Sequence, residues 1–153
     1  MSQSGPGGEP EVKVESMRTV LIVEDDPNNM AVFCAVLGYQ KYEVLEATTA
    51  QEAVGACRRH LAPIDLVLCD CNLPDGSGPE VAVEVLKSHP EAVILFVSGM
   101  PMNQWSHQDV EWLRQLPQGS IDFLEKPFRV SDLETRMDLL LRHGAATMFS
   151  SRH

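Results

Sequence analysis

Short apolar segments alternate with longer amphipathic segments from residue 18 onward. Five of the apolar segments have the length and residue types of strands, namely residues 19–23, 42–47, 64–69, 92–97 and 120–124. The third and fourth are apolar almost throughout, which is typical of central strands that helices cover on both faces. Because repeated strand and helix units form parallel sheets, this pattern predicts an α/β fold.

A helix is expected after each predicted strand, and the first and last helices have clear end signals. Asp26 is the predicted N-cap of the first helix, Pro27 its first residue and Gly38 its C-cap. Residues 131–134, with the sequence Ser-Asp-Leu-Glu, match a capping box at the start of the last helix. Gly144 is its predicted end.

Apolar residues at helical spacing indicate the faces that the other helices bury. Asn103 is the predicted cap of the fourth helix, and residues 71–79, dense in Pro, Gly and Asp, are predicted to be a loop. The predicted inward residues are Ala53, Val54 and Cys57; Val81, Val85 and Leu86; Trp105, Val110, Trp112 and Leu113; and Leu133, Met137, Leu140 and Leu141.

The chain has 153 residues, which fits one domain of ordinary size. Residues 1–16 are rich in Gly, Pro, Ser and Glu and are predicted to be a disordered leader. The folded domain is expected over residues 17–144, with a flexible tail over 145–153. Because neither a bilayer-spanning apolar run nor a signal peptide is recognisable, we expect a cytoplasmic protein without membrane contact.

Charge and cysteine spacing exclude two further classes of function. A formal net charge of −10 argues against direct nucleic-acid binding, which needs clustered Lys and Arg. The cysteines lack the spacing of a zinc site and are predicted to be reduced and packed, and three histidines show no partner spacing for metal or catalysis. These residues are Cys34, Cys57, Cys69 and Cys71, and His60, His89 and His107.

Acidic side chains follow the predicted strands at the edge where open parallel sheets carry their function. The residues at these strand ends are Glu24, Asp25 and Asp26; Asp70; Ser98; and Glu125 and Lys126. Several carboxylates packed together repel one another, so such a cluster needs a cation. Mg²⁺ is the predicted ion, because it prefers an octahedral shell of carboxylate, water and phosphate oxygens.

The same edge predicts phosphoryl chemistry. Lys126 can balance both the acidic cluster and an incoming phosphoryl oxygen, and Ser98 adds a hydroxyl donor. An aspartate at this centre can attack phosphorus to give an acyl phosphate, which makes Asp70 the predicted nucleophile. Asp26 is expected to act as a helix cap rather than as a ligand.

Four segments carry a resemblance to a known family. In order and spacing, Leu-Ile-Val-Glu-Asp-Asp-Pro (21–27), Leu-Cys-Asp-Cys-Asn-Leu-Pro-Asp-Gly-Ser-Gly (68–78), Val-Ser-Gly (97–99) and Phe-Leu-Glu-Lys-Pro-Phe (123–128) resemble the signature of bacterial response-regulator receivers. The resemblance covers about residues 18–143. It implies a doubly wound, flavodoxin-like sheet of five parallel strands in the order 2-1-3-4-5, flanked by five helices.

The resemblance also implies a role for each matching residue. Asp70 would be the phosphoacceptor, and Mg²⁺ would be held by Asp25, Asp70 and the backbone carbonyl of Asn72, with Glu24 acting through water. Lys126 would bind the phosphoryl group and be joined to Pro127 by a cis bond. Ser98 and Phe123, the latter where Tyr is frequent, would form the switch.

The function that the resemblance implies is a phosphorylation-dependent switch in a two-component phosphorelay. Asp70 would take its phosphoryl group from a phosphohistidine of a sensor histidine kinase or of a phosphotransfer protein. The face made by the fourth helix, fifth strand and fifth helix would then bind a downstream protein or a second copy of the domain. Catalysis would be limited to self-catalysed phosphoryl transfer and slow autodephosphorylation.

Four alternatives compete with this interpretation. A phosphatase of the haloacid dehalogenase type would need a second aspartate where Asn72 stands, and a flavodoxin-like carrier would not tolerate Glu24 and Asp25 beside a flavin phosphate. The chain could also be a pseudo-receiver used only for docking, which the complete acidic, Ser and Lys set argues against. The last alternative, a receiver taken from a hybrid histidine kinase, is left open by the sequence.

Overall fold

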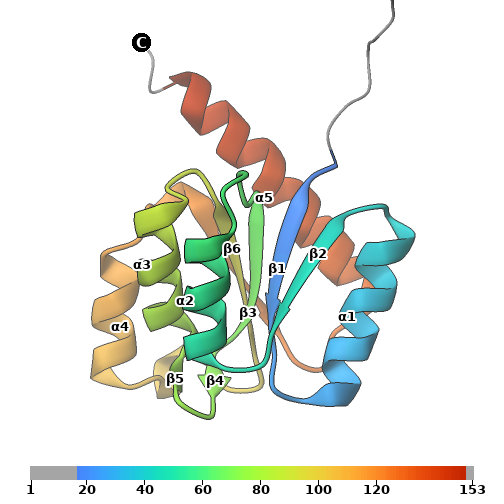
Figure 1. Ribbon diagram of the computed structural model, residues 1–153. Coiled ribbons are helices and arrows are strands. Elements are labelled where there is room, and N and C mark those ends of the chain that lie inside the picture. Colours follow the sequence, from blue (N-terminus) through green and yellow to red (C-terminus); the bar gives the residue numbers. More distant parts are fainter. Residues whose placement is uncertain (1–16, 151–153) are drawn as a thin grey trace, which may run out of the picture.

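A parallel sheet of five strands forms the centre of the computed structural model, which describes residues 17–150 (Figure 1). The strands lie in the order β2-β1-β3-β6-β7. Their bounds are β1 (Thr19–Val23), β2 (Glu43–Ala47), β3 (Leu66–Asp70), β6 (Val93–Ser98) and β7 (Ile121–Glu125). Numbered along the chain within this sheet, they give the order 2-1-3-4-5, so the predicted fold class is confirmed.

Helices cover both faces of the sheet (Figure 1). On one face lie α1 (Pro27–Tyr39) and α5 (Val130–Ser150), and on the other lie α2 (Ala50–Arg59), α3 (Gly78–Ser88) and α4 (His107–Arg114). Short 3₁₀ turns, η3 (Met102–Gln104) and η4 (Gln118–Ser120), come before α4 and β7. A small hairpin of β4 (Asn72–Leu73) and β5 (Gly76–Ser77) follows β3.

The two faces of the sheet have separate cores because side chains alternate along each strand. Leu21 and Val23 point to the α2, α3 and α4 layer, whereas Val20 and Ile22 point to α1 and α5. Phe96 is the largest fully buried side chain and belongs to the first core. The helical residues of the second core are Met30, Phe33, Leu37, Leu133, Met137, Leu140 and Leu141, which confirms the predicted inward face of the last helix.

The end of α1 differs from the prediction that Gly38 caps it. The helix continues to Tyr39, and Lys41, at φ 67°, supplies the left-handed residue that ends it. The Tyr42 N–H donates to the Leu37 carbonyl (3.1 Å) and the Lys41 N–H to the Gly38 carbonyl (3.0 Å), which is a Schellman motif. The prediction was wrong because Gly is the usual left-handed residue, and here a lysine takes that place.

The predicted cap of α4 was also wrong. Asn103 lies in the turn η3, and Ser106 caps the helix by accepting a hydrogen bond from the Asp109 N–H (3.0 Å). Trp105 therefore precedes α4 rather than lying within it. Of the apolar residues expected on this helix, Leu113 is buried, and Val110 and Trp112 are half-buried.

Both ends of α5 depart from the sequence signals. The helix begins at Val130, and Asp132, rather than Glu134, accepts a hydrogen bond from the N–H of Arg129 (3.2 Å), the residue before the helix. It runs past Gly144 to Ser150, because an isolated glycine costs a helix only about 1 kcal/mol. Residues 71–79 are likewise not a plain loop, since they contain the β4–β5 hairpin and the start of α3.

Other predictions on chain organisation have mixed outcomes. The four cysteines are free thiols, and all but the half-buried Cys34 are buried. Within residues 17–150, no helix combines the length and apolar character needed to cross a membrane. The predicted leader, residues 1–16, and the last residues of the predicted tail, 151–153, lie outside the described residues, so the domain boundaries stay predictions.

The burial of α5 leads to a stability prediction. Leu133→Ala removes a side chain that is 0% exposed, so we expect the free energy of unfolding to fall by about 2–5 kcal/mol in urea titrations. Leu139→Ala is the matched control on the same helix, because Leu139 is 54% exposed, and we expect a change within about 0.5 kcal/mol. Equal losses in the two variants would contradict the packing described for α5.

Candidate functional site

Four neighbouring strands bring the predicted site residues to one edge of the sheet. In the registers of the parallel pairs, Val23 lies beside Cys69, Asp70 beside Val97, and Ser98 beside Glu125. The residues that end or follow these strands therefore meet at the carboxyl edge, as expected for an open parallel sheet. The β4–β5 hairpin lies at the same edge, at the bottom of Figure 1.

An acidic cluster of Glu24, Asp25 and Asp70 occupies this edge. One carboxylate oxygen of each residue lies within 4.8 Å of the others. Glu24 is only 1% exposed and Asp70 8%, whereas Asp25 is exposed. Asp26, beside them, accepts a hydrogen bond from the Asn28 N–H (2.8 Å) and caps α1, as predicted.

Lys126 supplies the positive charge that faces this cluster. Its ammonium donates to Asp70 Oδ2 (3.1 Å) and lies 3.6 Å from Glu24 Oε1. Its backbone is held in place by the N–H that donates to the Ser98 carbonyl (2.8 Å), and the bond to Pro127 is cis, as the resemblance implied. Burial acts to lower the pKa of Lys126, but the neighbouring carboxylates outweigh it and raise that pKa.

Glu24 is the most buried carboxylate of the cluster. Its Oε2 accepts a hydrogen bond from the Asp26 N–H (3.1 Å), whereas Oε1 is buried without a hydrogen-bond partner in the described part of the chain. Burial raises the pKa of Glu24 to about 7, and the charge of Asp70 acts in the same direction. A buried carboxylate with an unsatisfied oxygen is stabilised by a cation or by water.

These residues fit a small divalent cation. The donors are hard carboxylate oxygens, they converge within one ion's reach, and one of them is buried and unsatisfied. Asn72, the other residue that the resemblance assigned to the metal, lies in the hairpin, and its N–H donates to Asp70 Oδ1 (3.1 Å). The structure therefore brings Asn72 to the cluster, together with Glu24, Asp25, Asp70 and Lys126.

The Ser98 hydroxyl, at the end of β6, makes its hydrogen bonds with Met100, two residues further along the chain. The hydroxyl donates to the Met100 carbonyl and accepts from the Met100 N–H, both at 3.0 Å. The Trp105 indole N–H donates to the same carbonyl (3.2 Å). A pocket of about 230 Å³, lined by Cys71, Ser98 and Trp105 among others, lies directly beside these residues.

Phe123 belongs to an aromatic group rather than to the acidic cluster. Its ring stacks on Phe96, with centroids 5.5 Å apart, and meets Trp105 edge to face at 5.5 Å. Offset-stacked and edge-to-face pairs of this kind stabilise packing beyond the area that they bury. The sequence had predicted packing for Trp105, and the structure shows it packed against Phe96 and Phe123.

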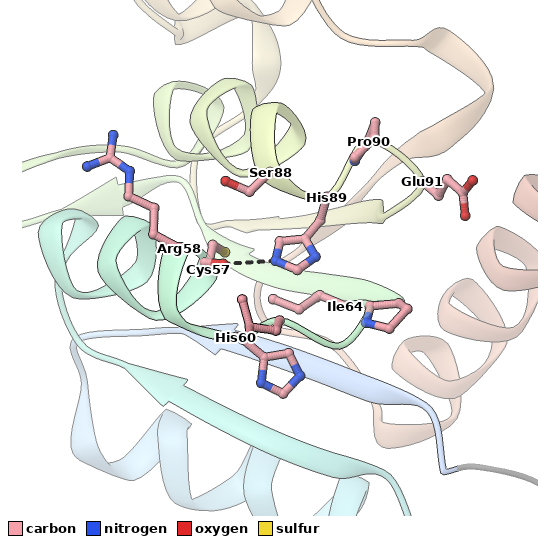
Figure 2. A pocket seen from close by; sticks show the side chains of 10 residues that line it. Cys57, Arg58, His60, Ile64, Ser88, His89, Pro90 and Glu91 are labelled. Carbon is pink, nitrogen blue, oxygen red and sulfur yellow. Dashed lines mark hydrogen bonds between the residues drawn. The ribbon is translucent and has the colours of Figure 1, made fainter.

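A larger pocket, of about 370 Å³, lies at the opposite edge of the sheet, where α2 and α3 end (Figure 2). His60 and His89, which received no role from the sequence, line it with Cys57 and Ile64. His89 Nε2 donates to the Cys57 carbonyl (2.9 Å), so this ring holds the two helix ends together. The pocket is separate from the carboxylates, and none of its lining residues belongs to the predicted site.

One residue near the site received no role from the sequence. Asp75, at the tip of the hairpin, accepts hydrogen bonds from the Ala50 N–H (2.7 Å) and the Gln51 N–H (3.0 Å) of α2. A turn at Pro-Asp-Gly is visible in the sequence, but its contact with a helix that begins 25 residues earlier is not.

Comparison with known proteins gives a family match over most of the chain. Residues 20–138 match the model of the response regulator receiver domain. The sensor kinase CckA of Brucella abortus is 31% identical over 124 residues, which are 80% of this chain and 12% of that protein. The probable transcriptional regulatory protein TcrX of Mycobacterium tuberculosis is 27% identical over 87% of this chain and 53% of its own length. The chain thus spans about half or less of these relatives.

Solved structures agree with the family match. A CheY-like receiver domain protein from Methanospirillum hungatei has a TM-score of 0.72 at 25% identity, covering 86% of this chain and 99% of its own. The receiver domain of the hybrid histidine kinase CckA has a TM-score of 0.65 at 26% identity, covering 80% of this chain and 98% of its own.

The raised pKa of Glu24 predicts how stability depends on pH in metal-free protein. An unfolded glutamate titrates near 4.5 and Glu24 near 7, so the folded state binds more protons between these values and loses stability as pH rises. At pH 8 with EDTA, we expect Glu24→Gln to raise the free energy of unfolding by on the order of 2 kcal/mol. At pH 4 the gain should vanish.

The measurement is urea unfolding of both proteins at the two pH values. Glu111→Gln, which changes an exposed glutamate on α4, is the control and should show neither effect. A loss of stability in Glu24→Gln at pH 8 would mean that the ion pair with Lys126 outweighs the cost of burial, contrary to this prediction.

Proposed function

The chain belongs to the response regulator receiver domain family, and from that premise we propose that Asp70 accepts a phosphoryl group in a two-component phosphorelay. One observation carries the proposal. The Asp70 carboxylate lies within hydrogen-bond distance of Lys126 Nζ (3.1 Å) and within 4.8 Å of two further carboxylates, at the edge where four strands end. This set combines a nucleophile, a cation site and a fixed positive charge.

In the proposed transfer, an Asp70 oxygen attacks the phosphorus of a phosphohistidine on a sensor kinase or a phosphotransfer protein. The P–N bond breaks, its electron pair stays on the imidazole, and an acyl phosphate forms on Asp70. Lys126, already at Asp70 Oδ2, would contact the phosphoryl oxygens and offset their charge. A carboxylate oxygen attacks through a lone pair, so the transfer requires no general base.

Mg²⁺ is part of the same proposal. Asp25, Asp70 and the Asn72 backbone carbonyl would hold the ion directly, and Glu24 would act through water. When bound, the ion would neutralise charge on the equatorial phosphoryl oxygens. The unsatisfied Oε1 of Glu24 and the convergence of three carboxylates support this assignment.

We further propose that phosphorylation acts by a population shift. Ser98 would exchange its contact with Met100 for the phosphoryl group, and Phe123 would turn inward. The face made by α4, β7 and α5 would then bind a downstream protein, or a second copy of the domain. The position of Phe123 supports this choice of face. It lies in β7, at the edge of the sheet, and packs on Trp105, which precedes α4 in the chain.

Two alternatives remain for the setting of the domain. A receiver within a hybrid histidine kinase is favoured by the match to the sensor kinase CckA and to the receiver of that kinase. A docking pseudo-receiver would need no acidic cluster, and the presence of this cluster argues against that alternative.

Catalysis would be limited to phosphoryl transfer onto the domain itself and slow autodephosphorylation. A cytoplasmic location without nucleic-acid contact remains a prediction.

Phosphorylation of Asp70 can be tested with a small donor. We expect the wild-type protein to gain one phosphoryl group from acetyl phosphate and Mg²⁺ in intact mass spectra, and Asp70→Asn to gain none, because the amide is not a nucleophile. Asp138→Asn, which changes an exposed carboxylate on α5, is the control and should be labelled like the wild type. Equal labelling of Asp70→Asn would remove the central claim.

The output face can be tested by amide hydrogen exchange. We compare protein in Mg²⁺ with protein in Mg²⁺ and beryllofluoride, a mimic of the acyl phosphate. Exchange should change in α4, β7 and the first turns of α5, and far less in α2. Phe123 lies in β7, packs on Trp105 just before α4, and accepts a hydrogen bond at its carbonyl from Arg136 of α5. A change confined to the acidic edge would contradict the proposal. Sedimentation velocity on the same samples tests whether the domain forms a dimer.

A further inference from the structure

We propose that Asp75 is a positioning residue that clamps the β4–β5 hairpin to the start of α2 and thereby holds Asn72 and Asp70 in register for the cation. This inference rests on the proposed Mg²⁺ site. It concerns a residue that lies on the hairpin but outside the acidic cluster.

The clamp consists of two hydrogen bonds between distant parts of the chain. Asp75 Oδ1 accepts from the Ala50 N–H (2.7 Å), and Oδ2 accepts from the Gln51 N–H (3.0 Å). These are the first two residues of α2, whose amides have no partner within the helix. A carboxylate also interacts favourably with the helix dipole there, and the two N–H groups lower the pKa of Asp75.

Two glycines allow the hairpin to lie close to its neighbours at both ends. At the tip, a Cβ on Gly76 would lie 3.3 Å from the Ala50 Cβ, which is tighter than ordinary van der Waals contact. At the base, a Cβ on Gly78 would lie 2.7 Å from the Asp70 carbonyl oxygen. The Gly78 N–H donates to the Cys71 carbonyl (3.0 Å) and closes that base.

Between these two ends lies the contact that matters for the site. The Asn72 N–H donates to Asp70 Oδ1 (3.1 Å), which orients the carboxylate whose other oxygen faces Lys126. The hairpin itself pairs only Asn72 with Ser77 and Leu73 with Gly76. Since so short a hairpin is not stable by itself, its tip contact with α2 must restrict its motion.

Helix α2 also has a local cap, which binds a different amide of the same helix end from the two that Asp75 binds. Thr49 Oγ accepts from the Glu52 N–H (3.0 Å), and Glu52 Oε1 accepts from the Thr48 N–H (2.8 Å). The first is an N-cap bond and the second reaches the residue before the cap, so both stay within one segment. Thr49→Ala therefore weakens the same helix end without touching the hairpin, and serves as the matched control.

The test compares wild type, Asp75→Ala, Asp75→Asn and Thr49→Ala in the full chain. Titration calorimetry with MgCl₂ should show an affinity about three- to tenfold weaker for Asp75→Ala, a smaller loss than for groups bonded directly to metal ligands. Asp75→Asn keeps one acceptor oxygen and should lie between it and the wild type. Thr49→Ala should bind Mg²⁺ like the wild type, although it lowers the urea midpoint.

Amide exchange in metal-free protein, followed by NMR, gives a readout that does not depend on Mg²⁺. Exchange of the Asn72 and Gly78 amides should be faster in Asp75→Ala and unchanged in Thr49→Ala. If Asp75→Ala and Thr49→Ala behave alike in both measurements, Asp75 is only a helix cap and the inference is wrong. If the wild type binds no Mg²⁺, the proposed Mg²⁺ site is wrong. The exchange data still decide whether Asp75 restricts the motion of Asn72.

Discussion

The ion pair of Lys126 with Asp70 and Glu24 is the interaction on which the site depends. Carboxylates within 4.8 Å of one another repel, and two of them are almost fully buried, so water relieves little of the cost. Lys126 offsets part of this repulsion. It follows β7, which β6 separates from the strand of Asp70, and no local sequence feature encodes this strand order. Glu24 Oε1, which the ammonium faces at 3.6 Å without a hydrogen bond, is the atom that the proposed cation would most help to stabilise.

Burial of the sheet explains how the fold tolerates the repulsion among these carboxylates. Strands β1, β3 and β6 are buried on both faces, and their apolar side chains build two cores that meet only through the sheet. That burial stabilises the strand ends without help from the acidic residues themselves. Electrostatic strain is therefore confined to one edge, where loops rather than strands can adjust to a ligand.

How far the sequence predicts the molecule depends on the range of each interaction. The strands, the cap at Asp26 and the burial of Leu133 follow from local patterns of apolar and polar residues. The structure has the cap and the buried leucine as expected, and the strand bounds within two residues of those predicted. The meeting of Asp25, Asp70 and Lys126 was also predictable, because each follows a strand of one parallel sheet. The caps predicted at Gly38 and Asn103 were wrong because nearby residues, Lys41 and Ser106, end α1 and cap α4 instead. Asp75 was missed because its partners lie 24 and 25 residues away.

The position of Lys126 along the chain has a consequence for how the domain assembles. Its partner Asp70 comes 56 residues earlier, and Glu24 earlier still, so a chain that grows from its N-terminus has all its site carboxylates long before their counter-charge. Only when β7 pairs with β6 does the ammonium reach them. Pairing of β7 and delivery of the counter-charge to the acidic edge are thus coupled, and a chain cut before residue 126 would lack the ammonium that offsets this cluster.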